Sequence, residues 1–334
     1  MCHLPIFPAP RRPLPFPIRP WDGSGCDFIN RDRRWHGNLP DSNVGQRGWR
    51  CFPLVPHQRT DGWAIDLNNN GRYDRGRDGV LVFDTNRDGR YEMDFDAWDA
   101  QMTGREKVLL LCSPHNPGGR VWSAEELRGV AEFCRRHDLI LVSDEIHQDI
   151  VFPGANFLPT DVAVPEARDR LIVLGATSKT FNLAGHHTGH AIIPDARLRA
   201  RYSAVMGGLG ISTNAFGMHM VEAAYSPDGA AWVDALVAYL DGNRKLLDEG
   251  LNGLPGVTSM PLEATYLAWA DFKGTGMEHE ELLRRVEKHA RIAVNHGPTF
   301  GAGGETFLRF NFATPRARVA EAVERLQKAF GDLQ

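Results

Sequence analysis

The sequence predicts an α/β protein with a mostly parallel central sheet, helices on both faces and a smaller α+β domain at the C-terminal end. Short apolar runs at residues 108–111, 139–142 and 171–174 have the length of buried strands. A helical pattern separates the first two runs and begins at a capping box, Ser123 to Glu126. Strand, helix and strand in this order are typical of a parallel sheet.

Composition places the chain among globular proteins, since 42% of its 334 residues are hydrophobic and 24% are charged. The net charge of −4 and the pI near 6.4 argue against a nucleic-acid interface. No apolar run has the length of a membrane span, and the N-terminus lacks the apolar core of a signal peptide. The five cysteines are scattered without metal-binding spacing. We therefore expect reduced thiols and a cytoplasmic location.

The chain divides into three predicted parts. Residues 1–78 are rich in proline, arginine and glycine without a sustained period, so we expect irregular chain there. Residues 79–195 contain the apolar strands and form one predicted domain, which the family resemblance given below implies is the remnant of a large domain. Residues 196–334 form a small domain, in which the patterns predict strands and helices. The strands are expected at 265–269 and 308–312, and the helices at 195–201, 232–247, 280–290 and 319–330.

Polar side chains follow each of the three apolar strands: Asn116, Asp144 and Lys179. The carboxyl ends of parallel strands meet at one edge of a sheet, which is where α/β proteins bind ligands. A desolvated lysine forms Schiff bases with aldehydes, and the commonest aldehyde cofactor is pyridoxal phosphate. Asn182 and Gly185 predict a loop after the lysine. Taken singly, each polar residue also fits a structural role, as a turn former, a helix cap or a surface lysine.

Three motifs in this order resemble the fold type I class I/II aminotransferase superfamily: Asn-Pro-Gly at 116–118, Ser-Asp-Glu-Ile-His at 143–147 and Ser-Lys-Thr-Phe-Asn at 178–182. The last two motifs look like the cystathionine β-lyase (C–S lyase) branch, because His147 replaces the tyrosine usual in ordinary aminotransferases. The resemblance runs from about residue 80 to the C-terminus. The first quarter of the chain does not share it.

The resemblance implies a pyridoxal 5'-phosphate enzyme and assigns roles to single residues. Lys179 is the catalytic residue, which forms the Schiff base and then moves the α-proton. Cofactor and substrate contacts are implied for the following: Asp144 at the ring nitrogen, Asn116 at the phenolic oxygen, His147 beside the cofactor, Ser178 with Thr177 at the phosphate, Arg309 at the substrate carboxylate and Asn295 in the same pocket.

The implied function is a C–S β-lyase acting on cystathionine-like or cysteine-S-conjugate amino acids, with aminotransferase activity beside it. It releases thiol, pyruvate and ammonia, and the family assembles as homodimers with shared active sites. In this family the N-terminal part supplies a phosphate-binding glycine loop, a stacking aromatic and a tyrosine for the neighbouring subunit. Residues 1–78 match none of these. A truncated, weakly active or inactive homologue is therefore a second interpretation.

A third interpretation is a calcium-binding module fused to a relic domain. Two stretches begin like calcium loops. Their twelfth positions hold Arg77 and Phe95 instead of the bidentate glutamate, so both fail the strict pattern. Polar turns explain the same residues, and we predict no metal. The calcium ligands of the alternative are Asp66, Asn68, Asn70, Asp84, Asn86 and Asp88.

Overall fold

The computed structural model describes residues 54–56, 63–65, 92–300 and 304–333, all within one compact unit, Cys51–Gln334. Strands β1 (Leu54–Pro56) and β2 (Trp63–Ile65) pair in antiparallel fashion. The calcium ligands of the alternative interpretation, residues 66–88, lie outside the described ranges, whereas Phe95, at the twelfth position of the second loop, begins a helix. Of their neighbours, Asp94 caps helix α1 (Phe95–Asp99), because its side chain accepts a hydrogen bond from the backbone N–H of Ala97.

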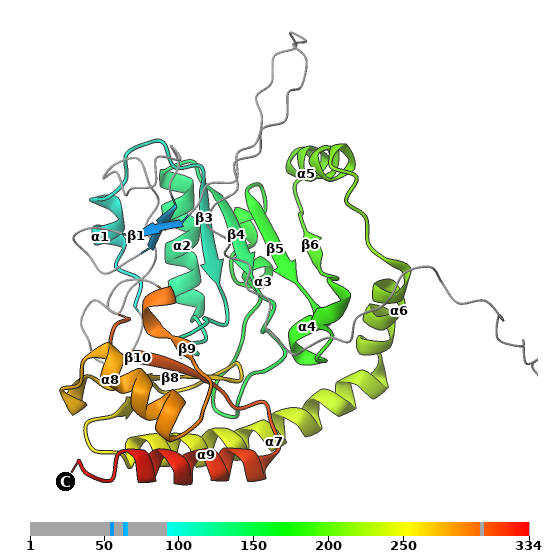
Figure 1. Cartoon of the computed structure of the whole chain (residues 1–334). Coiled ribbons are helices and arrows are strands. Elements are labelled where there is room, and N and C mark those ends of the chain that lie inside the picture. The colour runs from blue at the N-terminus through cyan, green and yellow to red at the C-terminus, as the bar shows by residue number, and fades with distance from the viewer. Residues whose placement is uncertain (1–53, 57–62, 66–91, 301–303, 334) are drawn as a thin grey trace, which may run out of the picture. The chain divides into compact units, whose positions relative to one another are not determined.

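The first sheet contains the three strands predicted from the apolar runs. Its order is β3 (Val108–Cys112), β4 (Ile140–Asp144), β5 (Leu171–Gly175) and β6 (His190–Ile192). The first three strands are parallel and β6 is antiparallel to β5, as Figure 1 shows. The sheet is therefore mostly parallel, and the polar residues that follow β3, β4 and β5 lie at the same edge.

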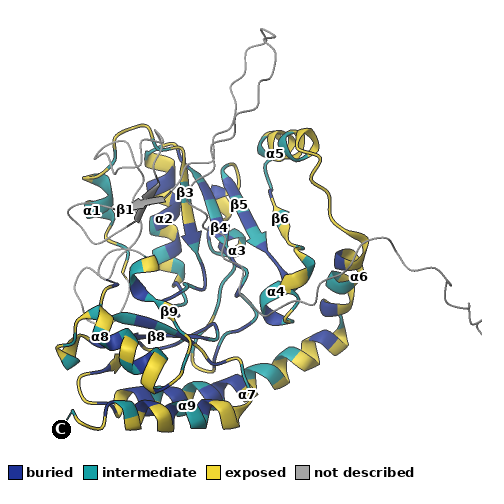
Figure 2. Cartoon of the chain, in the orientation of Figure 1, coloured by how far each residue is buried: buried dark blue, intermediate teal, exposed yellow. Residues whose placement is uncertain are grey.

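Helix α2 (Ala124–Arg136) covers one face of this sheet. Its predicted capping box is present, since Glu126 N donates to Ser123 Oγ and Ser123 N donates to Glu126 Oε2. Burial of apolar surface between helix and sheet stabilises this core. The buried side chains are Leu127, Val130, Ala131, Phe133 and Cys134 of α2, and Leu111, Leu141, Leu171 and Val173 of the strands (Figure 2). Two short helices follow the acid-bearing strand β4, namely α3 (Thr160–Ala163) and η1 (Pro165–Ala167).

The second sheet is antiparallel. Its order is β7 (Thr258–Ser259), β8 (Leu267–Asp271), β10 (Phe307–Asn311) and β9 (Asn295–His296). Helices α7 (Pro227–Asn252) and α9 (Arg316–Ala329) contribute to its core. Ile150 and Phe152, which follow β4 in the chain, are buried in this second core. Val151 forms an isolated antiparallel bridge with Ala264.

The other elements of the described chain connect the two sheets or border them. The predicted helix at 280–290 differs from the structure, because only its first turn is α-helical and a π-helical segment replaces the rest. Breaks of this kind depend on tertiary contacts more than on periodicity. The elements that connect or border the two sheets are α4 (Thr177–Thr180), η2 (Ala184–His186), α5 (Ala196–Gly208), α6 (Ala215–Ala224), η3 (Lys273–Thr275), α8 (His279–Leu283), the π-helical η4 (Arg284–His289) and η5 (Gly297–Phe300).

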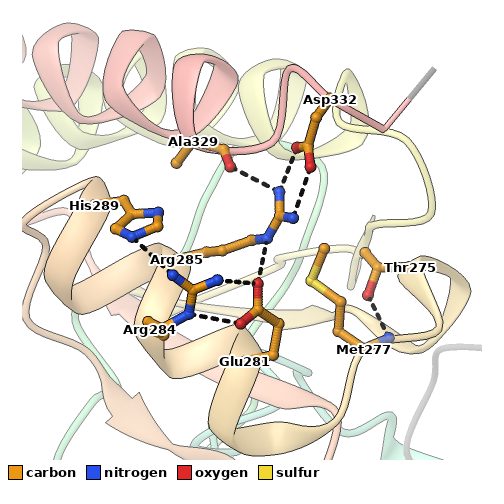
Figure 3. A network of polar contacts seen from close by, with 8 residues as sticks. All are labelled: Thr275, Met277, Glu281, Arg284, Arg285, His289, Ala329 and Asp332. Atoms are coloured by element: carbon orange, nitrogen blue, oxygen red, sulfur yellow. Dashed lines mark hydrogen bonds and ion pairs between the residues drawn. The ribbon is translucent and has the colours of Figure 1, made fainter.

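Ion pairs hold the π-helical segment against the C-terminal end of the chain (Figure 3). Glu281 accepts hydrogen bonds from Arg284 and Arg285, which lower the pKa of its carboxyl to about 2. Arg285 also donates to the backbone oxygen of Ala329 at 3.0 Å and to Asp332 Oδ2 at 2.7 Å. The side chain of Arg285 thereby connects η4 with the end of α9.

The boundaries at residues 78 and 195 stay predictions. The two sheets have separate cores, and Ile150 and Phe152 belong to the second core although they precede the predicted boundary at 195. Among the helices of the described ranges, none is both long enough and apolar enough to span a membrane.

Candidate functional site

Lys179 lies in α4, one turn of helix that follows β5 directly. The loop predicted after the lysine begins only beyond this turn, at residues 181–183, and leads into η2. The turn contains neither glycine nor proline, and Phe181 N donates to Thr177 O at 3.0 Å to close it. Asn182 ends the turn in the left-handed region with φ +54°, which asparagine tolerates well. The half-buried lysine is thus held on a defined helical turn at the carboxyl end of the sheet.

Asp144 is the last residue of β4, beside the strand that carries the lysine turn. One carboxylate oxygen accepts a hydrogen bond from Ile146 N at 3.2 Å. Burial raises the pKa of Asp144, while the hydrogen bond from Ile146 and the positive charge of Lys179 oppose that rise. An electrostatic effect of this kind requires proximity. The structure therefore brings the amine and the acid into one neighbourhood.

His147 lies on the turn after Asp144 and is 2% exposed. Its Nδ1 has no hydrogen-bond partner in the described structure. The imidazole ring meets the edge of the Tyr266 ring, with 5.5 Å between centroids. Burial, together with the positive charges of Lys179 and Arg309, lowers the pKa of His147 to about 4. The imidazole is therefore neutral at pH 7 and has one ring nitrogen free for a ligand.

The buried imidazole of His147 should make stability depend on pH. Its pKa is about 4 when folded and 6.5 as a free group, so the unfolded chain binds more protons between these values. Stability from this group is complete above pH 6.5 and falls as the pH drops towards 4. Replacement by phenylalanine should remove about 3 kcal/mol from the change in unfolding free energy over that range.

Urea unfolding of the cofactor-free protein at several pH values measures this effect. The buried carboxyls Asp144 and Glu145, whose pKa values are raised by burial, act in the opposite direction but are common to both proteins. The difference between wild type and His147→Phe therefore isolates the histidine. Parallel pH profiles of the two proteins would contradict the assignment of a neutral, buried imidazole.

Arg309, on β10, connects the two sheets through its guanidinium. Nη1 donates to Asn116 Oδ1 at 2.8 Å, and Nη2 donates to Asn295 Oδ1 at 2.8 Å. The group lies over the ring of Phe300, with 4.5 Å to the centroid. None of the ion pairs among the described residues includes Arg309. A half-buried guanidinium with neutral partners is suited to bind an anion.

The turn that carries Asn116 is held against the second sheet by Gly119. The backbone oxygen of Gly119 accepts hydrogen bonds from Glu263 N and Ala264 N, each at 3.0 Å. Its φ of +68° favours glycine, and a Cβ would lie 2.2 Å from Leu262 Cδ1. The close approach of these two segments fixes the place of Asn116 opposite Arg309.

Ser178 is half-buried in α4, and its backbone oxygen accepts from Leu183 N at 3.0 Å. No side-chain contact in the described structure joins it to the other predicted site residues. Hydrogen bonds connect Arg309 with Asn116 and Asn295, and charge effects connect Lys179 with Asp144 and His147. In the ranges that the structure describes, no cluster of three histidine, cysteine or acidic side chains could hold a metal ion.

Sequence reasoning missed the aromatic residues of the site. Tyr266 was expected only as part of the strand at 265–269, and no role was predicted for Phe300. Thr265 has φ +72°, which is exceptional for a β-branched residue and no pattern in the sequence indicated it. Its N–H donates to Ile150 O and its hydroxyl accepts from Leu267 N, so the neighbouring structure fixes this conformation. Tyr266 is thereby placed beside His147.

Comparison with known proteins identifies the family. The model of the family described as aminotransferase class I and II matches residues 73–326. The cystathionine beta-lyase PatB of Bacillus subtilis (strain 168) is 37% identical over 247 residues, which are 73% of this chain and 63% of the relative. The protein MalY of Escherichia coli (strain K12) is 32% identical over 225 residues, 67% of this chain and 57% of the relative. The chain thus spans about three fifths of the length of these relatives.

Solved structures show the same fold. Cystalysin from Treponema denticola, whose crystal structure contains pyridoxal 5'-phosphate, has a TM-score of 0.70 at 31% identity and covers 80% of this chain and 66% of its own. A PLP-bound C–S lyase from Staphylococcus hominis has a TM-score of 0.67 at 29% identity and covers 79% and 66%. These similarities confirm the predicted fold type I α/β architecture. The chain belongs to the class I and II aminotransferase family, on its C–S lyase branch.

Proposed function

We propose that this chain is a pyridoxal 5'-phosphate-dependent C–S β-lyase with aminotransferase activity beside it. Its substrates are cystathionine-like or cysteine-S-conjugate amino acids. The reaction consumes water and yields a thiol, pyruvate and ammonia. The single observation that carries this proposal is the neighbourhood of the Lys179 amine, the Asp144 carboxylate and the neutral imidazole of His147 at one sheet edge.

The side chains at this edge fit the chemistry of the cofactor. The Lys179 amine can bind an aldehyde, and the Asp144 carboxylate can pair with a pyridine nitrogen. The buried Nδ1 of His147, which has no partner in the described structure, can contact a polar ring substituent. Asn116 Oδ1 already accepts from Arg309, so the amide nitrogen is the group that donates to the phenolic oxygen. Ser178 and Thr177 are the candidates for the phosphate.

Each site residue has a distinct task in the proposed reaction. Lys179 would bind the cofactor aldehyde. Once the amino group of the substrate has displaced it from the aldehyde carbon, the freed amine would remove the proton from the substrate Cα as general base. Asp144 keeps a proton on the ring nitrogen. Bound pyridoxal phosphate supplies the electron sink that makes the Cα proton acidic. Loss of the sulfur substituent from Cβ then releases the thiol.

Arg309 supports an α-amino acid as the substrate class. Its two terminal nitrogens are held by the neutral amides of Asn116 and Asn295, and its charge acts on His147. A carboxylate would meet a guanidinium that needs no rearrangement to bind it bidentately. The hydrogen bond from Arg309 to Asn116 connects the proposed site of the substrate carboxylate with the proposed cofactor site.

The proposed function is tested by titration of the purified chain with pyridoxal phosphate. Attachment of the cofactor to a lysine should produce a visible absorption band, and the loaded protein should release pyruvate from cystathionine. A band without pyruvate release would favour a weakly active homologue. Absence of a band in the wild type would contradict the proposal. The calcium alternative has its own readout, a calcium-dependent rise in melting temperature that Asp66→Ala and Asp84→Ala remove.

We further propose that the enzyme works as a homodimer and in the cytoplasm. Large apolar side chains are exposed from the end of α5 into α6. Figure 2 marks exposed residues on both helices. Exposed apolar groups of this kind are typical of protein interfaces. Cys112 and Cys134 are free thiols, as a reducing compartment requires. The exposed fractions are 67% for Leu209, 52% for Ile211, 76% for Phe216 and 61% for Met218.

The variant Phe216→Glu should convert the proposed dimer into monomers. A buried, unpaired carboxylate at an interface is costly, so the dissociation constant should rise by about a hundredfold or more. Light scattering coupled to gel filtration measures the mass. Val162→Ser is the matched control, because Val162 is 60% exposed on α3, away from this segment. A wild-type monomer, or a Phe216→Glu dimer as tight as the wild type, would contradict the proposed interface.

A further inference from the structure

A buried hydrogen bond that has not been discussed so far joins two turns. One is α4, which carries Lys179 and is called the lysine turn; the other, at residues 145–149 directly after Asp144, is called the acid turn. Thr180, which follows Lys179 directly, is 2% exposed. Its hydroxyl donates to Asp149 Oδ2 at 2.9 Å. A hydrogen bond to a carboxylate is stronger than one between neutral groups, and its loss leaves a half-buried acceptor unsatisfied.

Asp149 belongs to the compact acid turn, which follows Asp144 at the end of β4 and also carries His147. Gln148 N donates to Glu145 O at 2.9 Å, and Ile150 N donates to His147 O at 3.0 Å. Ile150 is then buried in the second core. The position of Asp149 is therefore fixed relative to His147 and to the end of β4.

The lysine turn is short and has few other attachments. Phe181, at its end, stacks on Trp232 with 5.3 Å between ring centroids. Within the described chain, the bond from Thr180 to Asp149 is the side-chain hydrogen bond that joins α4 to the turn after β4. A four-residue helix has little stability of its own and depends on such contacts.

We propose that Asp149 and Thr180 are positioning residues, whose hydrogen bond holds the turn of Lys179 against the turn of Asp144 and His147. The proposal rests on the proposed function, since it assigns to this bond the placement of the amine relative to the acid. A bridge of this kind preorganises two groups that must reach opposite ends of one cofactor ring. Without it, α4 is free to shift while the sheet beneath it remains intact.

Two other polar groups face the Asp149 carboxylate. His190, on β6, attracts it, and the ring of His190 lies so close over Gly175 that a Cβ there would be 2.3 Å from Nε2. Tyr225, after α6, has its pKa raised by burial and by the charge of Asp149. Burial raises the pKa of Asp149, while Thr180 and His190 oppose the rise. Comparison of variants at one fixed pH near neutrality keeps these groups in a constant state.

The first test uses the cofactor-free protein, so it does not depend on the proposed function. Thr180→Val keeps the shape of the side chain and removes the donor, and Thr180→Ser keeps the donor. Amide hydrogen exchange at Phe181 and Leu183, whose N–H groups close α4, should accelerate about tenfold or more in Thr180→Val and return towards wild type in Thr180→Ser.

Thr275→Val is the matched control for the same chemical change. The hydroxyl of Thr275 donates to Phe272 O at 2.7 Å and accepts from Met277 N, as Figure 3 shows in part. Both hydrogen bonds of the Thr275 hydroxyl lie in and next to η3, which follows β8 of the second sheet, and neither involves α4. Thr275→Val should leave exchange at Phe181 and Leu183 unchanged.

The second test measures the dissociation constant of pyridoxal phosphate from the visible band. Thr180→Val should raise it about tenfold or more, whereas Thr180→Ser and Thr275→Val should stay within about twofold of wild type. A uniform loss of stability would affect both valine variants alike and would not be rescued by serine. Should Thr180→Val not fold, Asp149→Ala should weaken binding more than Asp149→Asn, whose amide oxygen still accepts.

The outcomes separate the two proposals. No band in the wild type contradicts the proposed function, while the exchange data still decide whether the bridge holds α4. A wild-type band combined with equal exchange and equal affinity in Thr180→Val and Thr275→Val overturns the bridge. If Thr180→Val does not fold, equal affinities of Asp149→Ala and Asp149→Asn for pyridoxal phosphate overturn the proposed bridge as well.

Discussion

Lys179→Ala should lose the visible band with pyridoxal phosphate and fall at least about a thousandfold in pyruvate release from cystathionine. In the proposed reaction the amine binds the aldehyde and later removes the Cα proton, so the substitution would remove both functions. No described neighbour can replace it: the acid Asp144 and the neutral imidazole of His147 lie beside it, and neither is an amine. Spectra and a coupled pyruvate assay measure the two losses separately.

Lys273→Ala is the control for this experiment, since Lys273 is exposed in η3. It should keep both the band and the rate of the wild type. Added methylamine should restore part of the pyruvate release in Lys179→Ala, because a free amine can take the place of the base. A persistent band in Lys179→Ala would place the cofactor on a different amine and refute the site.

Arg309→Met should lower kcat/KM for cystathionine by about a hundredfold or more, mainly through KM. The substitution removes the proposed bidentate partner of the substrate carboxylate and also the donor to Asn116 Oδ1. Arg309→Lys should recover little, because an ammonium cannot reproduce the planar fork of hydrogen bonds. Steady-state kinetics with cystathionine and with a simple S-alkyl cysteine measure the effect.

The carboxylate itself can be tested through the substrate. Wild type should strongly prefer an S-alkyl cysteine over the corresponding S-alkyl cysteamine, which lacks the carboxylate, and Arg309→Met should show little preference. Arg316→Met is the matched control, since Arg316 also donates to an asparagine oxygen, Asn243 Oδ1, and lies 4.6 Å from a ring centroid, that of Tyr239. An unchanged preference in Arg309→Met would exclude the proposed role.

Much of the fold could be predicted because its signals are local. The apolar runs at 108–111, 139–142 and 171–174 correspond to β3, β4 and β5 within two residues, and the capping box of α2 is present. The apolar runs reflect burial within the sheet, although Val108 and Leu110 of β3 remain exposed, and the capping box reflects the need to satisfy helix N–H groups. Both signals are encoded in adjacent residues. The order of the strands then follows from the connecting helix.

The contacts that assemble the site could not be predicted in the same way. The bond from Arg309 to Asn116 spans 193 positions in the sequence, and the bond from Thr180 to Asp149 joins two turns after different strands. No periodicity encodes such pairs, because they depend on how the loops at the sheet edge pack. The same holds for the left-handed Thr265 and for the π-helical η4, which tertiary contacts impose on residues that favour regular structure.

The burial of Ile150 and Phe152 in the second core has a consequence for protein engineering. A chimaera that exchanges the C-terminal half for that of a relative would separate these side chains from the partners they evolved with. The backbone bridge between Val151 and Ala264 also crosses this junction, so a mismatch there would act next to the turn that carries His147. Functional hybrids should therefore place the crossover before Ile150 or transfer residues 150–152 together with the C-terminal half.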